Sequence, residues 1–102
     1  MGEEAITEEE ERLLALLESS HTFPCVFTFK LIYRSEAGVE ERLVKTISSA
    51  AGVEDAVAPT QRRESAAGRF TSLTLDLPVD GAKDVLQLYR VIREQEEVVS
   101  YF

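Results

Sequence analysis

Apolar and polar residues alternate strictly along two stretches of the chain, and each stretch predicts a half-buried β-strand. In residues 70–79 the apolar set is Leu73, Leu75 and Leu77, with polar residues between them. In residues 22–34 one parity holds Phe23, Cys25, Phe27, Phe29, Leu31 and Tyr33. We expect these two sets to face a core, and the intervening residues of both strands to form a second, wetter face.

Three other stretches carry apolar residues at helical spacing, and each predicts a helix. The first, residues 7–19, opens with Thr7 and Glu10 at the spacing of a capping box. The second ends at Gly52, and Asp80 is the expected N-cap of the third. Their apolar stripes are Leu13, Leu14, Leu16 and Leu17; then Val39, Leu43, Ile47 and Ala50; then Val85, Leu88, Tyr89 and Ile92.

The order of these elements predicts an α+β fold, a ferredoxin-like βαββαβ sandwich with an extra N-terminal helix. Residues 53–60 complete it as an edge strand and residues 98–102 as a short last strand. We divide the chain into an acidic N-terminal helical arm, residues 1–21, and a ferredoxin-like domain, residues 22–102. The leucine stripe of the arm is expected to cover an apolar spot on the wetter face, formed by Val26, Ile32 and Phe70.

The charge of the chain is concentrated at its N-terminal end. The 102 residues carry a net charge of −8, and the first twenty hold seven acids against one base, a balance of −6. The remainder is nearly neutral at −2, with twelve acids against ten bases. This distribution offers no basic footprint for nucleic acid. No stretch reaches the about 18 apolar residues of a membrane span, and the acidic start differs from a secretory signal, so we expect a cytoplasmic protein.

Catalytic and metal-binding residue types are scarce. Cys25 is the single cysteine and His21 the single histidine, so neither an internal disulfide nor a Cys/His zinc site can form. The parity of Cys25 predicts a buried, inert thiol, and His21 is expected to make a polar contact at the helix end. The absence of asparagine excludes acylphosphatase chemistry in its usual form. We therefore expect no enzymatic activity, no cofactor and no metal.

A polar segment that contains Gly68 connects to the second alternating strand and predicts a hairpin. Its arginines could bind an anion or an acidic partner, although solvated loop arginines are a common alternative. The candidate partner-binding surface comprises Arg62, Arg63, Ser65, Arg69, Phe70 and Ser72, together with Lys30.

Several of these residues also carry a family resemblance. The groups are Phe23-Pro24 with Phe27 and Phe29-Lys30; Arg63-Glu64-Ser65 with Gly68-Arg69-Phe70 and Ser72; and Leu88-Tyr89. Over about residues 22–102 the chain resembles the YbeD-like bacterial proteins of unknown function. The resemblance implies a small cytoplasmic protein with a ferredoxin-like fold similar to ACT regulatory domains, which bind amino acids at dimer interfaces. The chain departs from the pattern at Ala66-Ala67, where a Ser-Lys pair is more usual.

These observations predict a small, non-enzymatic regulatory or adaptor domain. It would bind a small molecule in an ACT-like homodimer, or another protein through its sheet and hairpin. The alternative is a nucleic-acid-binding domain that stacks bases on the open sheet face. Gly68-Arg69-Phe70 is similar to the corresponding strand of RNA-recognition domains, but Ser72 and Thr74 stand where aromatics are wanted, and Asp76 would repel phosphate.

Overall fold

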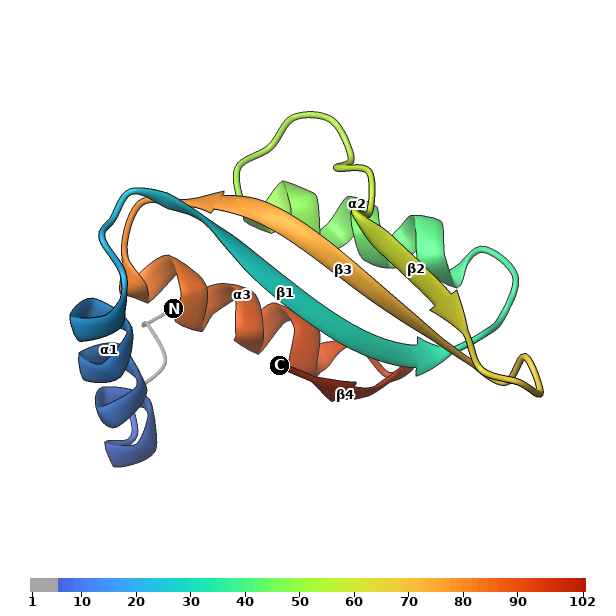
Figure 1. Ribbon diagram of the computed structural model, residues 1–102, viewed down its shortest axis with the longest axis horizontal. Coiled ribbons are helices and arrows are strands. Elements are labelled where there is room, and N and C mark those ends of the chain that lie inside the picture. The colour runs from blue at the N-terminus through green and yellow to red at the C-terminus, as the bar shows by residue number, and fades with distance from the viewer. Residues whose placement is uncertain (1–5) are drawn as a thin grey trace, which may run out of the picture.

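The computed structural model describes residues 6–102, which form three helices and four strands (Figure 1). In chain order these are α1 (Glu8–Ser20), β1 (Cys25–Arg34), α2 (Val39–Ala50), β2 (Gln61–Glu64), β3 (Phe70–Val79), α3 (Ala82–Glu94) and β4 (Val98–Tyr101). The first five residues of the acidic arm lie outside the described part. No helix within residues 6–102 has the length and apolar character needed to cross a membrane.

The four strands form one antiparallel sheet in the order β2-β3-β1-β4. Its centre is the long pair β1 and β3, which runs in register from Cys25 opposite Val79 to Arg34 opposite Phe70. Helices α2 and α3 pack side by side behind one face of this sheet (Figure 1). The predicted α+β class is confirmed.

The core lies between this face and the two helices. The alternating sets of β1 and β3 point into it, and Phe29, Leu31, Leu75 and Leu77 are all fully buried. The helices contribute the predicted stripe residues Leu43, Ile47, Val85, Leu88 and Ile92. The parity predicted for both long strands is therefore correct, and no helix within residues 6–102 covers the opposite face of the sheet.

Helix α1 begins as predicted but packs elsewhere than expected. Thr7 and Glu10 form the capping box, each accepting the other's backbone N–H at 3.1 Å. The helix lies against α3, and its Leu14 and Leu17 belong to the core cluster. The expectation that this stripe covers the opposite face of the sheet was wrong, because an ion pair to α3 holds α1 on the helical side.

The edge strand predicted for residues 53–60 is not formed there, and β2 begins only at Gln61. The preceding loop turns back onto the end of α2, where Ser48 is the acceptor for two of its backbone groups. Val53 N–H donates to the Ser48 carbonyl at 3.0 Å, and Val57 N–H donates to the Ser48 hydroxyl at 3.0 Å. These bonds occupy the groups that a strand would have offered to its neighbour.

The predicted N-cap of α3 is also displaced by one residue. Gly81 occupies the cap position and makes no side-chain cap bond. The backbone N–H of Asp80 instead donates to the carboxylate of Asp84 at 2.8 Å. The prediction was that the Asp80 side chain accepts a backbone N–H of the first turn. In the structure the side chain of Asp84, in the first turn, accepts the backbone N–H of Asp80 instead.

Candidate functional site

The face of the sheet turned away from α2 and α3, here called the open face, keeps apolar side chains in contact with solvent. Val26 is 67% exposed at one end, and Val99 is 51% and Phe70 38% exposed at the other. Single exposed apolar residues are ordinary, but clusters of them mark interaction surfaces. Phe70 and Val99 form such a cluster with Ile32, next to the hairpin.

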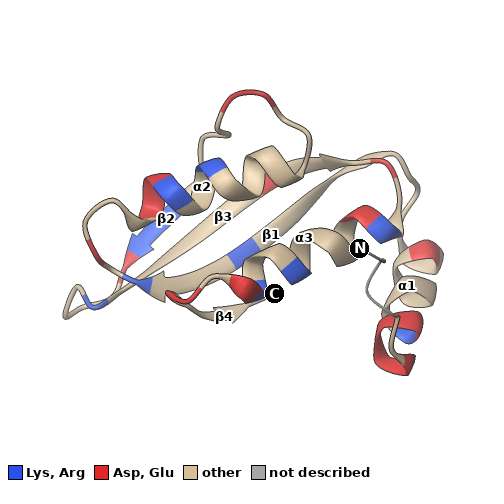
Figure 2. Cartoon of the chain, turned by 180° about the vertical axis from the view of Figure 1, so that it is seen from behind, with Lys and Arg blue, Asp and Glu red and all other residues tan. Residues whose placement is uncertain are grey.

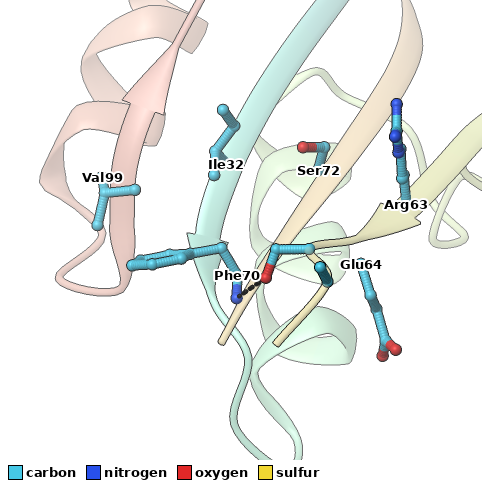
Figure 3. A pocket seen from close by; sticks show the side chains of 8 residues that line it. Ile32, Arg63, Glu64, Phe70, Ser72 and Val99 are labelled. Atoms are coloured by element: carbon cyan, nitrogen blue, oxygen red, sulfur yellow. Dashed lines mark hydrogen bonds between the residues drawn. The ribbon is translucent and has the colours of Figure 1, made fainter. Parts of the chain in front are cut away.

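Strand register aligns three side chains across this end of the open face. Ser72 of β3 lies opposite Arg63 of β2 on one side and opposite Ile32 of β1 on the other. Directly opposed side chains in an antiparallel sheet have Cβ atoms about 5 Å apart. Figure 3 shows the resulting row of a guanidinium, a hydroxyl and an aliphatic side chain.

The β2–β3 hairpin places Phe70 beside this row. Ser65 N–H donates to the Phe70 carbonyl at 2.8 Å, and Phe70 N–H donates to the Ser65 hydroxyl at 3.2 Å (Figure 3). Gly68 has a φ of 71°, and its N–H closes the turn by donating to the Ser65 carbonyl at 2.9 Å. The ring of Phe70 then extends toward Val99 of β4 (Figure 3).

Together these side chains surround a depression of about 430 Å³, here called the hairpin hollow. It is lined by Ile32, Arg63, Glu64, Ser65, Ala66, Phe70, Ser72 and Val99. Four of the seven predicted surface residues, Arg63, Ser65, Phe70 and Ser72, therefore meet at one place. The hollow joins an apolar wall to two hydroxyl groups, one guanidinium and the side chain of Glu64.

Arg62 does not share this site, because neighbouring residues of a strand point to opposite faces. Its guanidinium donates to Glu40 of α2 at 2.6 Å and to Glu64 at 3.1 Å. The hydrogen bond between Arg62 and Glu40 raises the pKa of the Arg62 guanidinium and lowers the pKa of the Glu40 carboxyl. Burial, together with the hydrogen bond that its hydroxyl donates to Glu40, raises the pKa of Tyr33 to about 12. Arg62 thus fastens β2 to α2.

The side chain of Arg63 differs from that of Arg62 in having no hydrogen bond or ion pair to any residue between 6 and 102. Its side chain is exposed at the edge of the hollow (Figure 3). A guanidinium carries five N–H donors in a planar arrangement that matches a carboxylate or phosphate. Arg63 is therefore the cationic group of the site that remains available to a ligand.

The other two predicted residues lie outside the hollow. Lys30 is on the open face opposite Thr74, near the middle of β1, and its backbone exchanges two hydrogen bonds with Phe102. Arg69 is exposed beside the hairpin turn, where its carbonyl accepts the Ser35 N–H. Both add positive charge near the hollow without lining it.

Sequence reasoning missed two contributors to this end of the sheet. Arg34 lies opposite Phe70 on the open face and donates to the Glu96 carbonyl at 3.2 Å. Its shared parity with Lys30 could have identified it. Val99 carries no comparable signal, because a register shift beside Ile32 and Tyr33 decides which residue of β4 reaches the open face.

At the hairpin end of the molecule basic residues lie among acids, and two of them are paired: Arg34 with Glu36, and Arg62 with Glu40 and Glu64. Figure 2 shows basic residues along β2, the hairpin and the end of β1, whereas α1 is mainly acidic. On the open face itself Lys30, Arg34 and Arg63 oppose a single acid, Asp76, whose carboxylate accepts the hydroxyl of Thr28 at 2.6 Å. The hairpin end of the open face is therefore locally basic on an acidic protein.

His21 and Cys25 lie at the opposite end of β1 from the hollow. The His21 ring packs edge-on against Phe27, with centroids 5.1 Å apart, and Cys25 is a half-buried free thiol that packs against the core. Residues 6–102 contain no group of three or more His, Cys, Asp or Glu side chains that could hold a metal ion.

Comparison with curated proteins and with solved structures gave no match. A family comparison gave one, to the family described as "Protein of unknown function (DUF493)", whose sequence model matches residues 18–102. This is the YbeD-like family, so the resemblance carried by the hairpin and first-strand residues is confirmed. The match begins near the end of α1 and includes the whole sheet with both of its covering helices. The chain belongs to this family, DUF493.

Proposed function

We propose that the chain is a small, non-enzymatic adaptor domain that binds another protein through the open face of its sheet. The observation that carries the proposal is the hairpin hollow, where exposed apolar side chains lie beside an arginine whose side chain has no partner among residues 6–102. The opposite face is sealed by α2 and α3, so binding there would require the core to open. We expect the domain to act in the cytoplasm, as the family resemblance implies.

We also propose that the fold is of the ferredoxin-like kind. After α1 the elements follow the order βαββαβ, and the strand order β2-β3-β1-β4 supports this description. Two helices on one face of such a sheet leave the other face free for a partner. An ACT-like regulatory role, in which a homodimer encloses an amino acid, is the small-molecule version of the proposal.

The exposure of the lining favours a protein over a small molecule as the ligand. Small-molecule sites usually bury most of the ligand surface. Here Phe70 and Val99 remain substantially exposed, so a small molecule would be enclosed only if a second copy covered the hollow. Thermal-shift measurements across the amino acids test this version, since a bound amino acid raises the melting temperature.

Nucleic-acid binding is a second candidate because Phe70 lies among Lys30, Arg34 and Arg63 on the open face. An exposed aromatic ring among basic residues is the arrangement that stacks single-stranded bases. Against it, Thr74 and Asp76 occupy the positions that follow along β3. Retention on heparin that falls steeply with ionic strength would favour this candidate over the adaptor.

A photo-crosslinking amino acid at position 72 tests the adaptor proposal in cells of the source organism. Ser72 lies on the open face, and Gln87 is an exposed position on α3 that serves as the matched control. We expect discrete cross-linked protein bands from position 72 and none of the same bands from position 87. Identical patterns from both positions, or no bands from either, would overturn the proposal.

A further inference from the structure

We propose that the hairpin hollow binds an acidic peptide segment of the partner, with a carboxylate on Arg63 and a neighbouring large apolar side chain against Phe70. This inference rests on the proposed adaptor function and specifies the chemistry that the adaptor recognises. It is carried by the contrast between Arg62 and Arg63 and by the composition of the hollow.

The carboxylate specificity comes from the arginine. The Arg63 side chain has no partner among the described residues, while that of the adjacent Arg62 is held by two carboxylates. Glu64 contributes to the lining of the hollow, but its carboxylate is bound to Arg62 at 3.1 Å. Paired carboxylates of the chain therefore leave the Arg63 guanidinium uncompensated, and a bidentate bond to an external carboxylate would neutralise it.

The hydroxyl groups of the hollow reinforce this preference. The Ser65 oxygen accepts the Phe70 N–H, and its own O–H has no acceptor within the described part of the chain. Ser72, between Arg63 and Ile32, has no side-chain hydrogen bond to another described residue. Both hydroxyls can donate, and a donor-rich site beside a cation favours a carboxylate over an amide or an amine.

The apolar half of the ligand follows from the opposite wall. Ile32, Phe70 and Val99 come from three different strands and border a depression of about 430 Å³, which has room for a large side chain. Covering exposed apolar surface contributes to binding in proportion to the area removed from water. A charged residue alone would leave this apolar wall exposed to water, so the peptide requires both a carboxylate and a large apolar side chain.

Charge argues against a second copy of this face as the occupant. A two-fold pairing places the same patch of both subunits in contact. The basic side chains Lys30, Arg34 and Arg63 of one copy would then lie close to those of the other, and like charges in contact disfavour such a pairing. An acidic peptide from another protein matches the same basic residues.

The test uses three fluorescein-labelled octapeptides: one alternates glutamate with leucine, one lysine with leucine, and one glutamate with serine. Binding to the full chain is measured by fluorescence anisotropy and by amide NMR shifts, with peptide up to millimolar concentration. We expect only the glutamate–leucine peptide to bind and to shift the amides of Arg63, Phe70 and Ser72. Replacement of Arg63→Ala or Phe70→Ala should weaken binding about tenfold or more.

Arg69→Ala is the matched control, because this arginine is exposed near the hollow but does not line it. We expect the affinity of Arg69→Ala for the glutamate–leucine peptide to stay within about twofold of that of the unmodified chain. Circular dichroism melts should show that all three variants fold. Equal losses for Arg63→Ala and Arg69→Ala would overturn the inference, because they would indicate diffuse attraction instead of a site.

The remaining outcomes separate this inference from the function on which it rests. Cross-links from position 72 without binding of the glutamate–leucine peptide would overturn acidic recognition and leave the adaptor standing. If neither the cross-links from position 72 nor binding of the glutamate–leucine peptide is observed, both proposals are overturned. A dimer in sedimentation that disappears with Phe70→Ala would assign the hollow to a second copy, and displacement of the peptide by oligouridylate would assign it to RNA.

Discussion

The carboxylate of Glu10 in α1 accepts two hydrogen bonds from the guanidinium of Arg90 in α3, at 3.0 Å from Nε and 2.9 Å from Nη2. The same carboxylate accepts the backbone N–H of Thr7 and completes the capping box. One side chain therefore both starts α1 and attaches it to α3. Removal of the Glu10 carboxylate should therefore weaken both the N-terminal cap of α1 and the contact of α1 with α3.

This arrangement predicts an acid-dependent loss of stability. The hydrogen bond from Arg90, followed by that from Thr7, lowers the pKa of Glu10 from 4.5 to about 2. A carboxyl whose pKa is lower when folded stabilises the fold above its unfolded pKa and loses this contribution as pH falls through the folded value. We expect Glu10→Gln to lower the denaturation midpoint at pH 7, and this difference to shrink between pH 4.5 and about pH 2.

The control is Glu11→Gln in the same first turn of α1, where the carboxyl is exposed and forms no bond to another described residue. Its midpoint should follow that of the unmodified chain at every pH. A difference for Glu10→Gln that is constant with pH would show that the ion pair to α3 does not form in solution.

The packing of α1 predicts unequal costs for two adjacent leucines. Leu17 is buried in the core cluster, whereas Leu16 is 61% exposed. Truncation of a buried leucine removes its burial and leaves a cavity, so Leu17→Ala should cost about 2–5 kcal/mol. Leu16→Ala should stay within about 0.5 kcal/mol. Urea melts measure both, and equal costs would indicate that α1 is bound differently.

The long elements could be predicted from the sequence because their periodicity is local. Alternation around Leu75 and Phe29 identifies the buried parity of both central strands, and the Thr7–Glu10 spacing identifies the start of α1. In each case the residues that decide the structure lie within a few positions of one another. The position of α1 could not be predicted in this way, because it depends on a bond between residues 80 positions apart.

The candidate site was predicted in part, for the same reason. The hairpin brings Ser65 and Phe70 together through local hydrogen bonds, which the glycine and polar pattern indicated. The separation of Arg62 from Arg63 depends on both residues lying in β2, which begins at Gln61 after a loop that bonds back to Ser48. Val99 reaches the hollow through a register shift that no sequence period reveals.

The parity of β3 predicts a second pair of unequal substitutions. Leu75 is fully buried opposite Phe29, and Thr74 lies on the open face opposite Lys30. Leu75→Ala should cost about 2–5 kcal/mol, because the cavity would lie at the centre of the core. Thr74→Ala should cost far less. Denaturant melts with similar losses for both would contradict the assignment of the two faces.

The positive φ in the hairpin turn predicts that the stability cost of replacing its glycine depends on the residue introduced. Gly68 has a φ of 71°, a region that glycine adopts freely and alanine does not, and a Cβ there would meet no atom within 4 Å. Gly68→Ala should therefore destabilise by about 1 kcal/mol through backbone strain alone, partly offset by a less flexible unfolded chain. Gly68→Asn should cost less, because asparagine tolerates this conformation better.

The two substitutions should also differ at the hollow. If alanine forces the turn to change, the bonds between Ser65 and Phe70 shift, and the amide resonances of Phe70 and Ile32 should move in NMR spectra of Gly68→Ala but much less in Gly68→Asn. Affinity for the glutamate–leucine peptide should fall in the same order, because the Phe70 ring forms part of the apolar wall. Identical stability and spectra for both variants would show that the turn does not require a positive φ at this position, and that the placement of Phe70 is set by the strands alone.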